Sequence, residues 1–189
     1  ASVEVDYSFN QAGSDTATFG TDYTNATVGT VTLTQAAKTY PITVDIAADA
    51  LVELSEDFTI DLTGITTALS DVALDATPGA TQAVGTITNM DSAVASVSNT
   101  AISVTEADGA SVDITVSLDR PIQAGAQVEV TYATADDTAN AMADYTPASG
   151  TMVFDNGTGS YTITIPITND QVVEPDGETF RFELSAVSN

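Results

Sequence analysis

The chain has 189 residues, of which 27 are Asp or Glu and only three are Lys or Arg, giving a net charge of −24. This charge repels nucleic acids and anionic membrane surfaces and attracts cations. The chain contains no Cys and no His, which excludes disulfides, thiolate metal sites and imidazole catalysis. It is 43% hydrophobic, enough to form a core, and it has no apolar run of about 18 residues that would predict membrane insertion.

Alternation of apolar and polar residues predicts β-strands along the whole chain. Residues two apart share one face of a strand, so each run has one buried and one exposed face. Gly, Asn, Asp and Pro separate the runs, and we find no amphipathic helix. The alternating runs are, in chain order, residues 3–9, 40–46, 58–62, 112–118, 128–132, 161–167 and 180–184. The pattern predicts an all-β protein.

The sequence repeats itself once. "DYTNATVGTVTL" at residues 22–33 matches "DYTPASGTMVF" at 144–154, and the segment 40–62 matches 161–184 with one inserted residue. Strands that recur at this spacing predict tandem copies of one β-unit, which we place at residues 1–91 and 92–189. Each copy is expected to lack part of the unit, because the first has no counterpart of residues 101–121 and the second has none of "AVGTITNMD".

Incomplete sandwiches expose strand edges. An unpaired edge strand invites pairing with another chain, so we expect partners of two kinds: neighbouring repeats of the same array, and strands of other molecules that pair with the free edges.

The order of motifs in both copies resembles the Calx-beta domain. It consists of "DY", a "GT" strand, "D-x-x-x-E-x-x-E-x-F" and, in the first copy, "GTIT-N-x-D". This domain is the calcium-binding module of sodium/calcium exchangers, and it is also found in an integrin and in bacterial surface proteins. The resemblance implies two tandem immunoglobulin-like antiparallel β-sandwiches with Ca²⁺ bound by loops at one end.

The family's ligand positions fall on acidic loops in both copies. In the first copy the implied ligands are Asp22, Asp49, Glu53, Glu56, Asn89 and Asp91, and Ala48 stands where the family usually has an acid. In the second copy they are Glu106, Asp144, Asn169, Asp170, Glu174, Asp176 and Glu178. Ca²⁺ takes six to eight oxygen ligands, and a sandwich brings loops that are distant in sequence to one end.

Two structural interpretations compete with ligation. The acids could be solvated loop residues of a very acidic surface, although their clustering at matched loops argues against this, because like charges repel unless a cation relieves them. Asp22 and Asp144 could equally cap turns. The tyrosines that follow them, Tyr23 and Tyr145, are predicted to be core residues.

The chain lacks the motifs of common enzymes. It has no Trp, no His, no Gly-rich phosphate loop and no G-x-S-x-G motif, so we expect a binding module and not an enzyme. The resemblance favours a calcium-rigidified adhesion or spacer module of a secreted or bacterial cell-surface protein, with Asn89 and Asp91 placing an ion at the junction of the copies. The alternatives are a calcium sensor that regulates a membrane transporter and an acidic spacer without specific sites.

Overall fold

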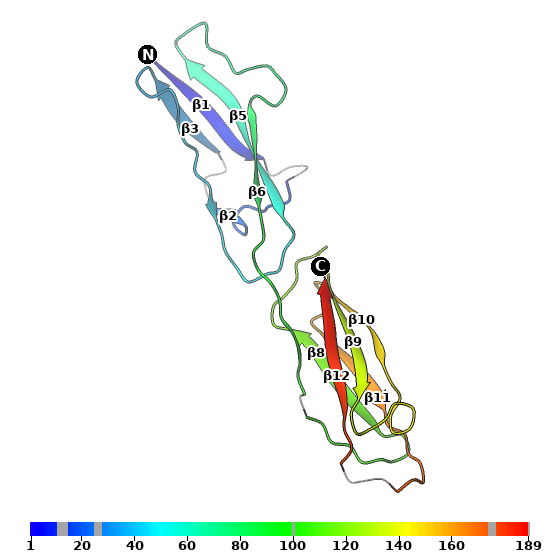
Figure 1. The fold of residues 1–189 in the computed structure, drawn as a ribbon. Coiled ribbons are helices and arrows are strands. Elements are labelled where there is room, and N and C mark those ends of the chain that lie inside the picture. The colour runs from blue at the N-terminus through cyan, green and yellow to red at the C-terminus, as the bar shows by residue number, and fades with distance from the viewer. Residues whose placement is uncertain (11–14, 25–27, 100, 174–176, 189) are drawn as a thin grey trace. The chain divides into compact units, whose positions relative to one another are not determined.

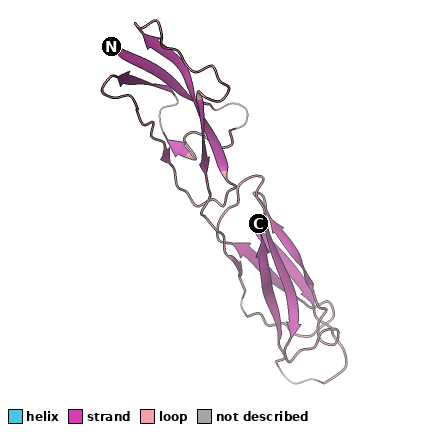
Figure 2. Ribbon diagram, turned by 45° about the horizontal axis from the view of Figure 1, so that its top comes forward, coloured by secondary structure: helices cyan, strands magenta, loops and turns pink. Residues whose placement is uncertain are grey.

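The computed structural model describes residues 1–189 except 11–14, 25–27, 100, 174–176 and 189. All regular secondary structure in the described residues is β, as predicted (Figures 1 and 2). No helix in this part of the chain has the length and apolar character that a membrane span needs. Contacts divide the chain into two units: Ala1–Asp49 with Leu54–Asn89, and Ala50–Glu53 with Met90–Asn189.

The first unit is built on a four-stranded antiparallel sheet in the order β3-β1-β5-β6. Its strands are β1 (Ser2–Asn10), β3 (Val28–Thr34), β5 (Glu56–Thr67) and β6 (Gln82–Ile87). A second, two-stranded sheet pairs β2 (Tyr23–Thr24) with β4 (Asp45–Ile46).

The core of the first unit is aromatic. Tyr23 is fully buried between Phe9 and Phe58, with ring centroids 5.6 and 5.1 Å away. Ile42 and Val44 pack against this cluster from the segment before β4. The burial of Tyr23 confirms its predicted core role.

The second unit is a sandwich of two three-stranded antiparallel sheets (Figure 1). One sheet has the order β10-β9-β12, made of β9 (Val128–Asp136), β10 (Ser149–Phe154) and β12 (Phe180–Ser188). The other has the order β11-β8-β7, made of β7 (Ala95–Val97), β8 (Ser111–Leu118) and β11 (Ser160–Pro166). Alternate residues of the two sheets meet in the core, where Val116, Val130, Phe154 and Ile165 are fully buried.

The predicted strands are found in the structure with one exception. Residues 40–44 are assigned no strand, and only Asp45 and Ile46 form β4. The matching segment in the second unit, residues 161–167, forms all but the first residue of β11, whose seven residues pair with β8. Of the four residues predicted to face the core, Ile42 and Val44 are half-buried, whereas Tyr40 and Ile46 are exposed. Alternation alone was not enough here, because a strand also needs a neighbour for its backbone hydrogen bonds.

Glycine is required where a ring of the central strand crosses the edge strand. Tyr7 lies opposite Gly29, and a Cβ at position 29 would come within 2.3 Å of the Tyr7 ring. Tyr132 and Gly150 form the corresponding pair in the second unit. The "GT" element of the repeat is therefore part of the packing of each sheet.

Candidate metal centre

Both units contain the same tight turn in front of the Asp-Tyr pair. The Oδ2 of Asp22 accepts a hydrogen bond from the Thr18 amide at 2.5 Å, and the Oδ2 of Asp144 accepts one from the Asn140 amide at 2.6 Å. The turn places the following tyrosine in the core and leaves the second carboxylate oxygen of the aspartate outside this bond. Both aspartates therefore cap turns, and capping does not compete with ligation through the other oxygen.

Three predicted ligands converge beside this turn in the first half of the chain. Asp22, Glu53 and Glu56 each offer a carboxylate oxygen, and these oxygens lie within 4.8 Å of one another. Asp22 comes from the turn before β2, Glu56 begins β5, and Glu53 lies three residues earlier. Asp22 and Glu56 are 8% and 7% exposed, so the cluster is largely withdrawn from water.

The chemistry of these donors fits a hard divalent cation. Ca²⁺ binds oxygen at 2.3–2.6 Å, so two ligands of one ion lie at most about 5 Å apart, a limit that the 4.8 Å separation satisfies. Three carboxylates at this distance also repel one another strongly without a cation, and burial increases the cost. They supply half or less of a calcium shell, and backbone carbonyls, amides or water must supply the rest.

The other predicted ligands of the first copy lie outside this three-residue cluster. Asp49 is exposed and Asn89 is half-buried. Asp91 forms an ion pair with Arg120, one of the three basic side chains of the protein. A guanidinium thus already compensates the charge of Asp91.

In the second unit one contact joins two predicted ligands, and another joins a predicted ligand to an aspartate that was not predicted. The Asp170 amide donates to Oε1 of Glu106 at 2.9 Å, and Nδ2 of Asn169 donates to Oδ1 of Asp108 at 2.7 Å. Glu178 and Asp144 are half-buried. Glu174 and Asp176 lie outside the described residues, and among those described the second unit has no acidic group as tight as the first cluster.

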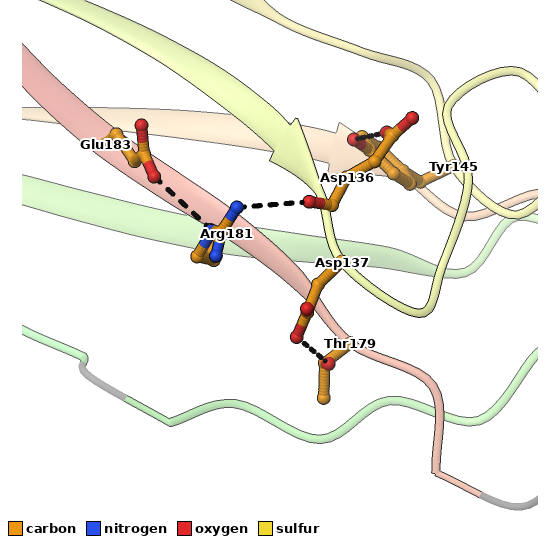
Figure 3. Close-up of polar contacts among 6 residues, drawn as sticks. All are labelled: Asp136, Asp137, Tyr145, Thr179, Arg181 and Glu183. Carbon is orange, nitrogen blue, oxygen red and sulfur yellow. Dashed lines mark hydrogen bonds and ion pairs between the residues drawn. The ribbon is translucent and has the colours of Figure 1, made fainter.

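Sequence reasoning missed Asp108 and a polar network beside the second Asp-Tyr turn. Asp108 follows Glu106 in "TEADG", and the positive φ of Gly109 marks the turn that brings it to Asn169. In the network, Oδ1 of Asp136 accepts a hydrogen bond from the Tyr145 hydroxyl at 2.6 Å (Figure 3). The same oxygen accepts one from the Ala141 amide at 2.9 Å.

Neighbouring contacts hold this network in place. Oδ2 of Asp137 accepts from the Thr179 hydroxyl at 2.7 Å, and Arg181 donates to the Asp136 carbonyl while it pairs with Glu183 (Figure 3). No residue of this network lies in a catalytic or phosphate motif, so the sequence offered no signal beyond the acidic pair at the end of β9.

Tyr145 is the best-packed residue of this network. It is 1% exposed, and its ring stacks on Phe180 with centroids 4.3 Å apart. Burial raises the pKa of the Tyr145 phenol above its usual 10.0, and the hydrogen bond to Asp136 raises it further. The neutral phenol is thus an internal support of the turn that carries Asp144, and the core role predicted for Tyr145 is confirmed.

The fold and the acidic turns define a class of tandem β-domains, and the comparisons identify the family. The model of the Calx-beta domain matches twice, over residues 1–91 and 88–189, so the chain belongs to the Calx-beta domain family. No match was found among curated proteins.

Solved structures of domains from CALX proteins are similar to the chain. CBD12 from CALX1.2 is 23% identical over 98% of this chain and 68% of that chain, with a TM-score of 0.42. The calcium binding domain CBD12 of CALX1.1 is 23% identical over the same shares, with a TM-score of 0.43. The apo-form Calx CBD1 domain is 29% identical over 44% of this chain and 70% of that chain, with a TM-score of 0.40.

Proposed function

We propose that the chain is a non-enzymatic calcium-binding module of a secreted or cell-surface protein, where it serves as a spacer or adhesion element. The observation that carries the proposal is the convergence of Asp22, Glu53 and Glu56 within 4.8 Å. Membership of the Calx-beta family and the oxygen-only donor set support Ca²⁺ as the ion.

The affinity should suit calcium-rich surroundings. Three carboxylates give a strong attraction, but they leave several coordination positions to weaker or mobile ligands. We expect a dissociation constant of about 10⁻⁴–10⁻³ M, the range of extracellular modules. An ion there would stiffen the turn before β2 against the start of β5, and this local stiffening suits a spacer.

Calorimetric titration of the chelator-treated chain tests the proposal. Wild type should bind Ca²⁺, and Glu53→Gln should weaken binding at least tenfold, because it removes a charged ligand and keeps the side-chain shape. Glu4→Gln is the matched control, since Glu4 is an exposed residue of β1 outside the cluster. It should bind as wild type does.

Two outcomes would contradict the proposal. Absence of calcium binding at millimolar concentrations, with the circular dichroism spectrum intact, would leave only an acidic surface. Equal affinities of wild type and Glu53→Gln would remove the cluster as the site.

A further inference from the structure

The segment Ala50–Glu53 belongs to the second unit, and Val52 fixes it there. Val52 forms an isolated parallel bridge with Ile122. Its amide donates to the Pro121 carbonyl at 3.1 Å, and its carbonyl accepts from the Gln123 amide at 2.9 Å. Val52 is 6% exposed, so both its backbone and its side chain are committed to this contact.

The turn that receives Val52 is backed by the core. Ile122 is 4% exposed and packs in the same cluster as Val116, Val128 and Phe154. The side chain of Arg120, just before the turn, is already paired with Asp91. The turn therefore offers two backbone hydrogen bonds and an apolar backing.

The repeat places a second copy of the Val52 segment at residues 172 and 173. "ALVE" at 50–53 corresponds to "QVVE" at 171–174, so Val173 is the counterpart of Val52 and Val172 that of Leu51. Val173 is 98% exposed and Val172 is 63% exposed. The same position in the repeat is thus buried against a turn in one copy and open to solvent in the other.

The segment before the exposed valines is held in shape. Oδ1 of Asp170 accepts a hydrogen bond from the Val172 amide at 2.6 Å, and the Asp170 amide donates to Glu106 at 2.9 Å. The valines thus project from an anchored loop, which lowers the entropy cost of binding.

We propose that Val172 and Val173 dock on another Calx-beta unit, at a turn of the type that residues 120–123 form here, through the same one-residue parallel bridge. The occupant is inferred from the chain itself, since its own turn holds the counterpart valine. The inference does not depend on calcium binding.

The test uses the intact chain and weakens the contact between Val52 and the turn at residues 120–123. Val52→Asn weakens the internal contact without changing the charge, so residues 121–123 of one molecule become available to Val173 of the next. Such a contact is head-to-tail and does not close, so the mass should grow with concentration. In EDTA and about 0.5 M NaCl, which screens the repulsion between chains, sedimentation equilibrium should show wild type as monomer and Val52→Asn as a growing series.

A second substitution decides whether Val173 is responsible. Val52→Asn/Val173→Asn should return to monomer, whereas Val52→Asn/Val84→Asn, which alters an exposed valine of β6, should associate like Val52→Asn. Amide exchange should show Gln123 deprotected in dilute Val52→Asn and protected again on association. If circular dichroism shows that Val52→Asn is unfolded, Val52→Ser replaces it in every arm.

The proposal is overturned by any of three results. The first is a folded Val52 variant that is monomeric at millimolar concentration. The second is association that persists after Val173→Asn, and the third is loss of association with Val84→Asn as complete as with Val173→Asn.

Discussion

The two units share one sheet and differ in what lies against it. β3-β1-β5 and β10-β9-β12 have the same strand order and direction, and each carries the same Asp-Tyr turn. In the second unit β8 pairs with β11 over seven residues, whereas residues 40–44 of the first form no strand. The turn and the tyrosine core therefore form without a β8-type strand, but the regularity of the segment after the turn depends on one.

The tight acidic cluster forms beside the sheet that both units share, and it does not require a sheet like β11-β8-β7. The tight three-residue cluster is in the first half of the chain, where no strand among the described residues corresponds to β8. In the second unit, Glu106 and Asp108 precede β8 and accept hydrogen bonds from the loop that carries Asn169 and Asp170. The segment that leads into β8 thus supplies the two acids that hold the loop of Asn169 and Asp170 in place.

The largest expected effect contrasts the two matching segments. Ile165 on β11 is fully buried, whereas its counterpart Val44 is half-buried. Ile165→Ala should lower the free energy of unfolding of the second unit by about 2–5 kcal/mol, and Val44→Ala should lower that of the first by less than about 1.5 kcal/mol. Urea unfolding followed by circular dichroism measures both, and equal losses would show that residues 40–46 are as well packed as β11.

Calcium should stabilise the first unit. An ion bound only by the native state adds about 1.4 kcal/mol at ten times its dissociation constant. Melting temperature should rise more in CaCl₂ than in NaCl of equal ionic strength. Glu56→Gln should abolish the extra rise in the melting temperature of the first unit in CaCl₂. Glu178→Gln, the matching substitution in the second unit, should leave that extra rise unchanged. Equal responses to both salts would assign the effect to screening.

Tyr145→Phe tests the hydroxyl that supports the second turn. Loss of its hydrogen bond to Asp136 should cost about 0.5–1.5 kcal/mol at neutral pH. Because the folded state raises the pKa of Tyr145, its stabilisation is complete below pH 10 and is lost as pH rises through the folded pKa. The alkaline loss of stability should therefore be shallower in Tyr145→Phe. An unchanged pH profile would contradict this origin.

The smallest effect concerns the tip of the two turns. Met142 has a φ of 71° and is 77% exposed, and Gly20, its counterpart, has a φ of 88°. This left-handed conformation is strained for methionine. Met142→Gly should therefore raise the free energy of unfolding by about 0.5–1 kcal/mol, and Gly20→Ala should lower it by about 1 kcal/mol. Thermal melts measure both, and a destabilised Met142→Gly would show that the side chain makes compensating contacts.

The sequence was sufficient for the fold class because alternation and repeat report local requirements. Val3, Val5, Val128 and Val130 alternate with polar residues, and this pattern gives a strand one face that can be buried. The same alternation at residues 40–46 overpredicted a strand, since hydrogen bonding to a neighbour is not encoded in the segment itself.

The family motif predicted the residues of the candidate site, but it did not predict which of them lie close together. The family pattern indicated Asp22, Glu53 and Glu56, and the structure brings these three together. It gave equal weight to Asp91, which lies outside this cluster and pairs with Arg120. Which acids meet depends on loop paths and on the few cations nearby, and neither follows from spacing along the chain.

The pairing of distant segments in each sheet has a consequence for folding rate. β1 pairs with residues 59–67, and β9 pairs with residues 180–188. Each central strand therefore pairs with a segment that lies about 50 residues further along the chain. Such non-local pairing folds slowly and leaves strand edges open to other chains in the meantime. A net charge of −24 keeps these nascent chains apart by repulsion. The acidity that draws cations to the loops therefore also protects the chain while it folds, and refolding in high salt should lose native protein to aggregation.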